Sequence, residues 1–373
     1  MTPNNDRITQ RQFIALCFVA LLSTIIHRLP QVLAQMAGYC AYLAPLVAIV
    51  PSFALLGFYL FAYRKSAGAG LCELIFSSAG KYAGRVIVAL CSGWIVFYAG
   101  FLLRSGAERF IVTIYPNSSH ILFIIGMGAL CLFGALGQFK SLARSAMLFR
   151  PLLLGVFIVV LALAVKGVDL KGDLSVTREQ IPSSLLASVA VANCFSTAVF
   201  LSFGFDHAGA KPKRAPYCVW VLVILLIIEV LCITTIGTFG AEMSARLNHP
   251  FFLLVRNTTL FGAIDRIEAL IIALWVFADF VLISSLIHIA SRNLRKCFSC
   301  REDIQKSRLF DMHRGRFITV LCAAAACGAG IAIAPTAFSL EIITAKIVPG
   351  VNLALAFFIL PLVLLIGKLR HRI

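Results

Sequence analysis

Charged residues are scarce in this sequence. Asp, Glu, Lys and Arg make up 13% of the 373 residues, whereas 60% are hydrophobic, and the mean hydropathy is +0.95. A soluble domain normally carries about a quarter charged residues. A soluble core could not absorb so much apolar sequence and still leave a polar surface. The composition therefore excludes a large soluble protein and predicts an all-α polytopic membrane protein.

Acidic residues and catalytic motifs are scarcer still. The chain has 16 Asp and Glu against 33 Lys and Arg, a net charge of +17. In a membrane protein such an excess of Lys and Arg belongs to cytoplasmic loops, so we expect no nucleic-acid partner. There is no phosphate-binding glycine loop, nucleophile elbow or HExxH motif. The lone CxxC at Cys297 and Cys300 lacks further zinc ligands at a suitable spacing. We therefore expect no enzymatic activity, no cofactor and no metal site.

Ten apolar stretches are long enough for a membrane-crossing helix, which needs about 20 residues. If the N-terminus is cytoplasmic, the inside segments hold 23 Lys and Arg residues and the outside segments hold 9. Because Lys and Arg collect on the cytoplasmic side, this count predicts that both termini are cytoplasmic. The expected spans are centred near Leu22, Val50, Tyr98, Leu130, Ile158, Ala198, Glu229, Trp275, Ala325 and Leu355.

Ten spans divide into five plus five. Many transporters consist of two inverted repeats, each of which begins with a discontinuous helix that holds the solute. We therefore expect residues 1–373 to form a single transmembrane permease-like domain, with repeat one at about 12–166 and repeat two at about 184–367. The two halves show no clear similarity residue by residue, so the repeat is inferred from the number of spans. This division predicts that spans one and six are the discontinuous, solute-binding helices.

The first span contains the unusual stretch STIIHRLP, residues 23–30. Arg in mid-membrane costs at least ~2.5 kcal/mol, and Pro30 removes a backbone donor and disfavours helical geometry at the preceding residue. These features predict a helix that unwinds near residues 23–28 and exposes backbone groups to the charged ends of a small solute. Alternatively, the span ends near Ile26 and Arg28 reaches the outer headgroups. The candidate binding residues are Ser23, Thr24, Ile25 and His27.

Span six has a second polar interruption. Asn193, Ser196 and Thr197 lie in its middle, and Gly204 follows. A polar break at the equivalent place in the second half is the best pointer to a transporter-type site. Alternatively, Asn193 only bonds neighbouring helices together. We include Asn193, Ser196 and Thr197 among the expected binding residues.

Four ionisable residues and one tyrosine complete the candidate site. Glu229 and Asp279 lie in the middle of spans seven and eight, where carboxyls are costly and usually functional. Arg104 precedes Glu108 by one helical turn on span three, so the two side chains can pair. Tyr98 shares an aromatic face of that span and is a further candidate for solute contact. These carboxyls are coupling groups for a proton or structural groups, and the sequence leaves both open.

Two stretches make the chain resemble the spore germinant receptor B-subunit family, also called endospore germination permeases. The first is ITQRQFIAL, followed by a span that ends in LPQ. The second is NHPFFLLVRNTTLFGAIDRIEALIIALWVFADFVLIS, in which a Pro-Phe and an Arg precede an Arg-x-Glu pair and a helix with Trp. The matching positions are Pro250, Phe251, Arg256, Arg266, Glu268 and Trp275.

The resemblance implies a ten-helix fold of the amino acid–polyamine–organocation permease type. It also implies a site for a small germinant, often an amino acid, between broken helices one and six. The implied partners are an A-type and a C-type subunit in the spore inner membrane. The chain departs from amino-acid permeases because Ile25 stands where small glycines are usual, and because span six has no acidic residue before Asp206.

We therefore expect a nutrient-sensing membrane subunit of a germinant receptor, embedded in the spore inner membrane or cell membrane. The alternative is a proton-coupled amino-acid transporter of the plasma membrane, which would use Asp279 or Glu229. A conduit for ions or water is a weaker third possibility, because a wide pore needs more polar residues than these spans contain.

Overall fold

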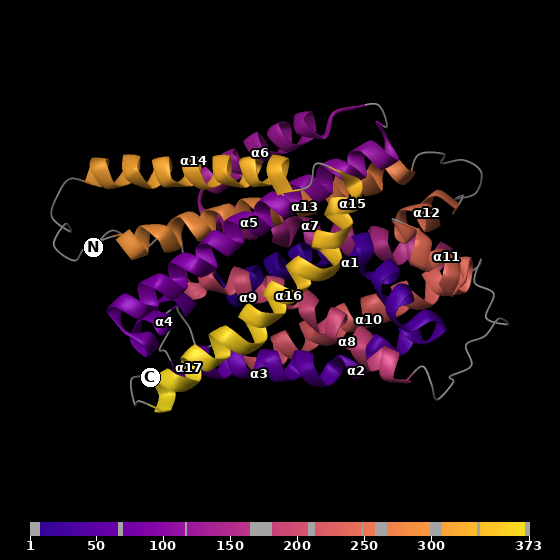
Figure 1. Cartoon of the computed structure of the whole chain (residues 1–373), viewed down its shortest axis with the longest axis horizontal. Helices are drawn as coiled ribbons and strands as arrows, with labels where there is room; N and C mark the ends of the chain where they lie inside the picture. Colours follow the sequence, from indigo (N-terminus) through magenta and orange to yellow (C-terminus); the bar gives the residue numbers. More distant parts are fainter. Residues whose placement is uncertain are drawn as a thin grey trace.

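The chain folds into a bundle of long helices, seen in a computed structural model that describes residues 8–65, 70–115, 118–164, 181–207, 213–247, 249–257, 267–298, 308–333 and 336–369 (Figure 1). Within these residues all regular structure is helical. In chain order the elements are α1 Gln10–Ala37, η1 Gly38–Tyr42, α2 Leu43–Val47, α3 Ile49–Lys65, α4 Leu71–Ala79, α5 Lys81–Thr113, α6 His120–Leu136, α7 Phe139–Ala164, α8 Ile181–Cys194, α9 Ser196–Leu201, η4 Ser202–His207, α10 Arg214–Phe239, α11 Ala241–Arg246, α12 Pro250–Asn257, α13 Ile267–Phe298, α14 Arg308–Ile333, α15 Ala337–Ile342, η6 Ile343–Ile347, α16 Val348–Leu353, η7 Ala354–Ile359 and α17 Leu360–Leu369.

The helices confirm an all-α polytopic membrane protein. Eight helical segments of the described chain are long and apolar enough to cross a membrane, and the shorter apolar segments Gln10–Ile26 and His120–Leu136 add two more. The ten predicted centres all fall within the described helices. Spans two, six and ten each comprise more than one element: α2 with α3, α8 with α9, and α15 through α17.

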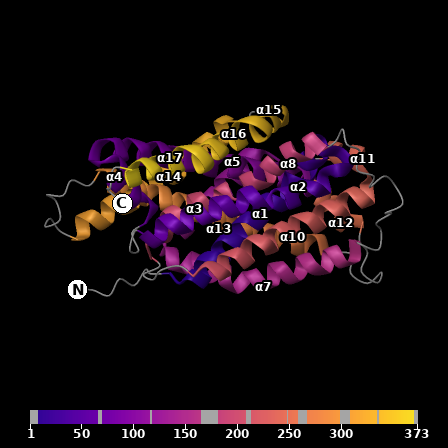
Figure 2. The same ribbon diagram turned by 90° about the horizontal axis from the view of Figure 1, so that it is seen from below.

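Helix α1 lies in the middle of the bundle (Figure 2). It begins at Gln10 because Thr9 caps it: the Thr9 hydroxyl accepts a hydrogen bond from the Gln12 backbone, and the Gln12 side chain accepts one from the Thr9 backbone. This reciprocal capping satisfies two amide groups that the helix start would otherwise leave free. α1 then packs against α7, α8, α10 and α13. Its position makes it the helix against which the other candidate residues are arranged.

Small residues allow α5 and α14 to approach closely. A Cβ atom added at Gly100 would lie 2.5 Å from the Ala326 carbonyl oxygen, and one at Gly330 would lie 2.8 Å from the Gly100 carbonyl oxygen. Membrane helices commonly pack through such small residues because the backbones can then touch. The contact fixes α5, which carries Tyr98, Arg104 and Glu108.

The structure corrects the expected break in span one. α1 is helical from Gln10 to Ala37 and contains Pro30, so the backbone of residues 23–28 is not unwound. The physical reason lies in the polar side chains of this segment. The Thr24 hydroxyl donates to the Leu21 carbonyl oxygen at 2.8 Å, and the Ser23 hydroxyl donates to Asp279 on another helix. Both hydroxyls are satisfied without opening the backbone.

Candidate functional site

Span six is interrupted at Phe195, as predicted. α8 ends at Cys194 and α9 begins at Ser196. The Phe195 amide donates to the Ala192 carbonyl oxygen at 3.1 Å, and the Ser196 hydroxyl donates to the Asn193 carbonyl oxygen at 2.6 Å. A serine hydroxyl that bonds a carbonyl of the preceding turn competes with the regular helical pattern. The polar residues therefore accompany a one-residue interruption of the helical hydrogen bonding, at which Phe195 keeps helical dihedral angles (φ −69°, ψ −13°).

The break leaves a polar group without a partner. The side-chain oxygen Oδ1 of Asn193 is buried and accepts no hydrogen bond within the described part of the chain. An unsatisfied buried amide costs about 1–3 kcal/mol, so such groups usually serve a purpose. This oxygen therefore gives no support to the alternative that Asn193 only bonds neighbouring helices together. The Oδ1 atom of Asn193 therefore has unused hydrogen-bonding capacity next to Phe195.

Tyr98 and Thr197 meet across the bundle. The Tyr98 hydroxyl lies 3.2 Å from the Thr197 hydroxyl, and both residues are buried. The Tyr98 ring also contacts Phe200 in an edge arrangement, with ring centroids 6.0 Å apart. The contact joins the aromatic face of α5 to the segment that follows the break in span six. Two of the predicted binding residues, from spans three and six, are therefore neighbours.

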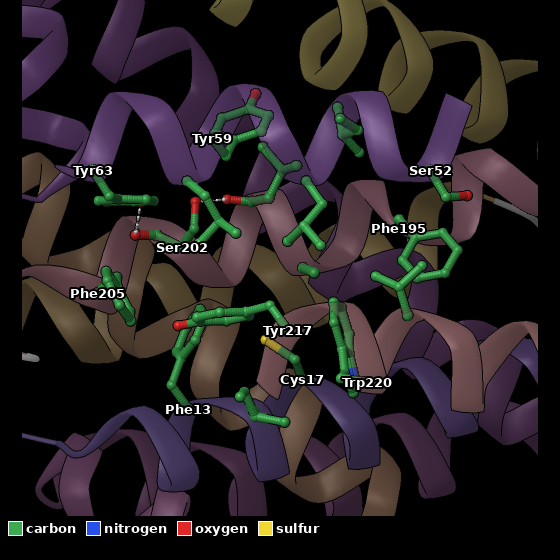
Figure 3. A pocket seen from close by; sticks show the side chains of 17 residues that line it. Phe13, Cys17, Ser52, Tyr59, Tyr63, Phe195, Ser202, Phe205, Tyr217 and Trp220 are labelled. Atoms are coloured by element: carbon green, nitrogen blue, oxygen red, sulfur yellow. Dashed lines mark hydrogen bonds between the residues drawn. The ribbon is translucent and has the colours of Figure 1, made fainter. Parts of the chain in front are cut away.

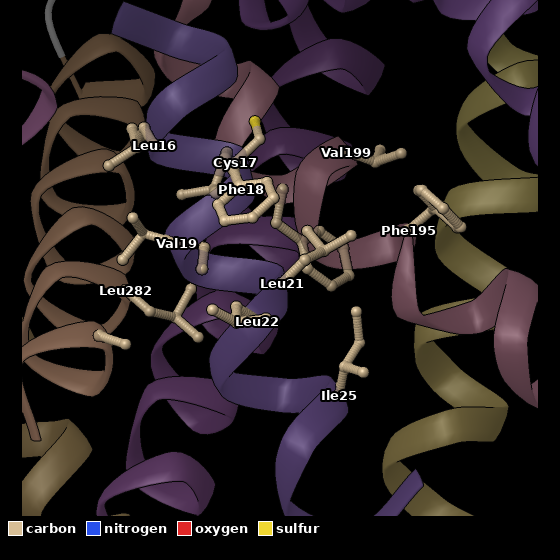
Figure 4. Close-up of a cluster of buried hydrophobic side chains, with 14 of the residues drawn as sticks. Leu16, Cys17, Phe18, Val19, Leu21, Leu22, Ile25, Phe195, Val199 and Leu282 are labelled. Carbon is tan, nitrogen blue, oxygen red and sulfur yellow. The ribbon is translucent and has the colours of Figure 1, made fainter. Parts of the chain in front are cut away.

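Ile25 of α1 belongs to the buried cluster that fills the space beside the break. Its side chain is fully buried, and Figure 4 shows it with Leu21, Phe195 and Val199. Leu21 and Ile25 come from α1, and the other two side chains flank Ser196 in span six. This cluster is consistent with the prediction that Ile25 of span one faces span six. The side chain of His27, a further predicted binding residue, lies outside the described residues.

Asp279 joins three helices through its carboxylate. It forms an ion pair with Arg109 of α5 and accepts a hydrogen bond from Ser23 of α1. All three residues are buried, with Asp279 only 7% exposed. A charged group inside a membrane protein is tolerated when it is paired in this way. The network therefore links α1, α5 and α13 at one point.

Sequence reasoning missed Arg109. It paired Arg104 with Glu108, and the structure confirms that ion pair at 2.6 Å, but it assigned Asp279 no partner. The signal that could have identified it is that an intramembrane carboxylate such as Asp279 needs a cationic partner. Few basic residues lie within the spans, so few candidates exist. Arg109, one residue after Glu108, was the nearest unassigned cation on span three.

Glu229 stands apart from this network. Its Oε2 atom is buried and has no hydrogen-bond partner among the residues described. It lies on α10, in the middle of span seven. The two intramembrane carboxyls therefore differ: Asp279 is paired, and one oxygen of Glu229 is not.

The motif that carries the family resemblance forms an aromatic cluster next to Ser23. Pro250 begins α12, and the Trp275 ring lies 6.2 Å from the Phe251 ring, centroid to centroid. Phe251, Trp275 and Ser23 line one small cavity. The side chains of Arg256, Arg266 and Glu268 lie outside the described residues. In the part of the chain that the structure describes, no cluster of His, Cys, Asp or Glu could hold a metal ion.

Solved transporter structures share this fold. A Na+-coupled sialic acid symporter in a substrate-bound outward-open state has 14% sequence identity and a TM-score of 0.63, over 95% of this chain and 80% of that chain. MhsT in complex with L-phenylalanine has 14% identity and a TM-score of 0.56, over 98% of this chain and 99% of that chain. No curated protein matches the sequence. Residues 7–324 match the family described as spore germination protein, and the chain therefore belongs to that family.

Proposed function

We propose that this protein is the membrane-embedded nutrient-sensing subunit of a spore germinant receptor. It binds a small germinant, such as an amino acid, between spans one and six. The observation that carries the proposal is the break in span six beside α1, where Asn193 has an unpaired buried oxygen and Thr197 meets Tyr98. Membership in the spore germination protein family and the fold of solute transporters support it.

The break supplies the groups that a small zwitterion needs. The Asn193 amide oxygen accepts from an ammonium group, and the hydroxyls of Thr197 and Tyr98 donate to a carboxylate. Ile25 limits the size of the ligand because it occupies the adjoining space on α1. Ser23 and Thr24 support α1 from within the bundle, and Ser196 supports the break, rather than contacting the ligand with their hydroxyls.

Signalling requires two arrangements of the helices. A ligand shifts the balance between them only if it binds one more tightly than the other. The Asp279 carboxylate, with Arg109 and Ser23, holds α1, α5 and α13 together in the described arrangement. A ligand at the break lies against α1 and α5, which are two of the three helices that this network joins. Binding of the ligand therefore acts on the contacts of Asp279 with Arg109 and Ser23. The A-type and C-type subunits of the receptor receive the change from these helices.

The test uses spores that lack this gene. Single amino acids are added one at a time, and germination is followed by optical density. The proposal predicts that the spores lose their response to one nutrient and that vegetative uptake of that nutrient stays normal. Normal germination with lost uptake of a labelled amino acid would overturn it. The wild-type gene restored at another site should return the response.

A proton-coupled amino-acid transporter is the second candidate, and the unpaired oxygen of Glu229 favours it. A carboxyl group with one buried, unpartnered oxygen can take up and release a proton during transport. This function predicts uptake of labelled amino acid into proteoliposomes under a pH gradient. It also predicts loss of uptake in Glu229→Gln but not in Glu242→Gln, since Glu242 is exposed on α11. Uptake that Glu229→Gln leaves intact would remove Glu229 from this role.

A further inference from the structure

A groove lies between α3, α4 and α17, which Figure 1 shows together near the C-terminal end of the chain. Its volume is about 250 Å³, and apart from Lys368 every residue of its lining is apolar. Pockets that enclose a whole small molecule commonly have volumes of roughly 300–1,000 Å³. The groove is therefore suited to one part of a larger molecule, such as a hydrocarbon chain.

The walls of the groove are held in place by contacts with the rest of the bundle. α17 packs closely on α4, because a Cβ atom added at Gly367 would lie 2.4 Å from the Ser78 Cβ atom. On α3, the Tyr63 hydroxyl donates to the Ser202 carbonyl oxygen at 2.7 Å, a bond that is drawn in Figure 3. These contacts fix α3 and α17 on either side of the groove, so the space between them exists before a ligand arrives.

The groove is continuous with the apolar outer surface of the bundle. Phe61 of α3 and Leu365 of α17 line it and are 42% and 46% exposed. Both residues belong to helical segments that are long and apolar enough to cross a membrane. Water gains little from an apolar lining, because a bound water needs several polar partners. The molecules that surround such a surface are phospholipids, and an acyl chain matches the lining.

Lys368 gives the groove one charged end. Its ammonium group lies 4.9 Å from the centre of the Phe61 ring, and its side chain is exposed in the last turn of α17. Arg64, one turn after Phe61 on α3, is exposed as well. The one carboxylate on these three helices is Glu73, which pairs with Lys296 of α13 at 3.4 Å. Basic residues near the membrane surface attract anionic headgroups, so the end of the groove favours a negatively charged lipid.

We infer that this groove binds a phospholipid with an anionic headgroup. One acyl chain occupies the apolar space between α3 and α17, and the phosphate lies outside it, at Lys368 and Arg64. The lipid joins the last helix to α3, which bonds the segment after the break in span six through Tyr63. None of the residues proposed to contact the germinant lines the groove, so the two sites are separate.

The experiment uses the full-length protein in detergent micelles, and native mass spectrometry counts the bound lipids. The probes are phosphatidylglycerol and phosphatidylcholine with the same palmitoyl and oleoyl chains, and glycerol phosphate represents a headgroup without chains. We expect saturable binding of phosphatidylglycerol and binding of phosphatidylcholine that is weaker by at least about fivefold. This factor is equivalent to the ~1 kcal/mol that one basic residue contributes near a membrane surface. Glycerol phosphate should not bind measurably.

Four variants locate the lipid. Lys368→Gln should weaken binding of phosphatidylglycerol by about fivefold and leave phosphatidylcholine unchanged, whereas Lys368→Arg should keep the preference. Lys213→Gln is the matched control, because Lys213 is exposed next to the start of α10 and lies outside the lining. Ala62→Phe fills the groove from α3 and should lower the binding of both lipids. If Ala62→Phe does not fold, the pair Lys368→Gln and Lys213→Gln decides the question.

Several results would overturn the inference. Equal binding of the two lipids, or equal loss of binding in Lys368→Gln and Lys213→Gln, would remove the anionic headgroup from Lys368. Glycerol phosphate that binds as tightly as phosphatidylglycerol would assign Lys368 to a free anion. Unchanged lipid binding in a folded Ala62→Phe protein would show that no acyl chain occupies the groove. Germination is not measured here, so failure of this inference leaves the proposed germinant site untouched.

Discussion

The first span contains Pro30 and Arg28 and remains one helix, whereas span six has neither near its middle and is interrupted at Phe195. The two regions differ in their polar side chains. Ser23 bonds a carboxylate on a neighbouring helix, and Ser196 bonds a carbonyl of its own segment. Hydroxyl bonds alone do not separate the two spans, because Thr24 also bonds a carbonyl of its own helix and Thr197 meets Tyr98 of α5. Span six differs in that it also contains Asn193, whose buried Oδ1 atom has no partner within the described chain. Proline alone is therefore a weaker sign of an interrupted helix in this chain than the polar cluster of Asn193, Ser196 and Thr197.

The largest expected effect is that of Asp279→Asn, which removes the negative charge that pairs with Arg109 and accepts the hydrogen bond from Ser23 of span one. The change leaves Arg109 buried without its counter-charge, and we expect the free energy of unfolding to fall by about 3–5 kcal/mol. Denaturant unfolding in detergent micelles would measure it. Glu73→Gln is the control, because the Glu73–Lys296 pair is long, at 3.4 Å, and half exposed, and such pairs contribute at most ~1 kcal/mol. Equal stability of Asp279→Asn and the wild type would contradict the role of the network.

Ile25→Ala tests the side chain that stands between the two spans. Loss of a fully buried isoleucine should lower the free energy of unfolding by about 2–5 kcal/mol. The space created beside Phe195 should also lower the half-maximal concentration of the germinant, if Ile25 limits the ligand. Spores with Ile224→Ala, a fully buried isoleucine of α10, provide the comparison. An unchanged dose response in Ile25→Ala alone would remove Ile25 from the site.

Ser23→Ala and Ser196→Ala sharpen the comparison between the spans. Ser23→Ala removes a hydrogen bond to a charged group and should cost about 1.5–3 kcal/mol of unfolding free energy. Ser196→Ala should cost less than ~1 kcal/mol, because the lost bond is local and neutral and the segment can become more regular. Unfolding of both variants in the same micelles would rank them. The reverse order would contradict this ranking of the two hydrogen bonds.

The smallest effect is expected for Pro30→Ala. In a continuous helix the new backbone amide at position 30 can bond the carbonyl one turn earlier and stabilise the fold by about 1 kcal/mol. Hydrogen exchange should show a protected amide at position 30, where proline has none, and little change over residues 23–28, which are already helical. Strong new protection across residues 23–28 would mean that the segment is unwound in the natural protein.

The number of spans and the break in span six could be predicted because they depend on local composition: apolar length for the spans, and clustered polar residues for the break. The continuity of α1 could not, because it depends on the contact between Ser23 and Asp279, which are 256 positions apart in the chain. Arg109 was missed for the same reason, since its partner lies on another helix. The pairing of Arg104 with Glu108 was predictable because one helical turn separates them. Orientation in the membrane and the inverted repeat remain predictions.

The central claim is that the germinant binds at the break in span six beside α1. It is tested most directly by spores that carry Thr197→Val as the sole copy of the gene, with the germination response measured against the amino acid that the intact receptor senses. Thr235→Val is the matched control, because its hydroxyl is also buried but bonds the Leu231 carbonyl of its own helix at 2.7 Å. We predict that Thr197→Val raises the half-maximal concentration of the amino acid by about five- to tenfold, equivalent to one lost hydrogen bond, and that Thr235→Val leaves it unchanged. A wild-type dose response in Thr197→Val spores would contradict the placement of the germinant at this break.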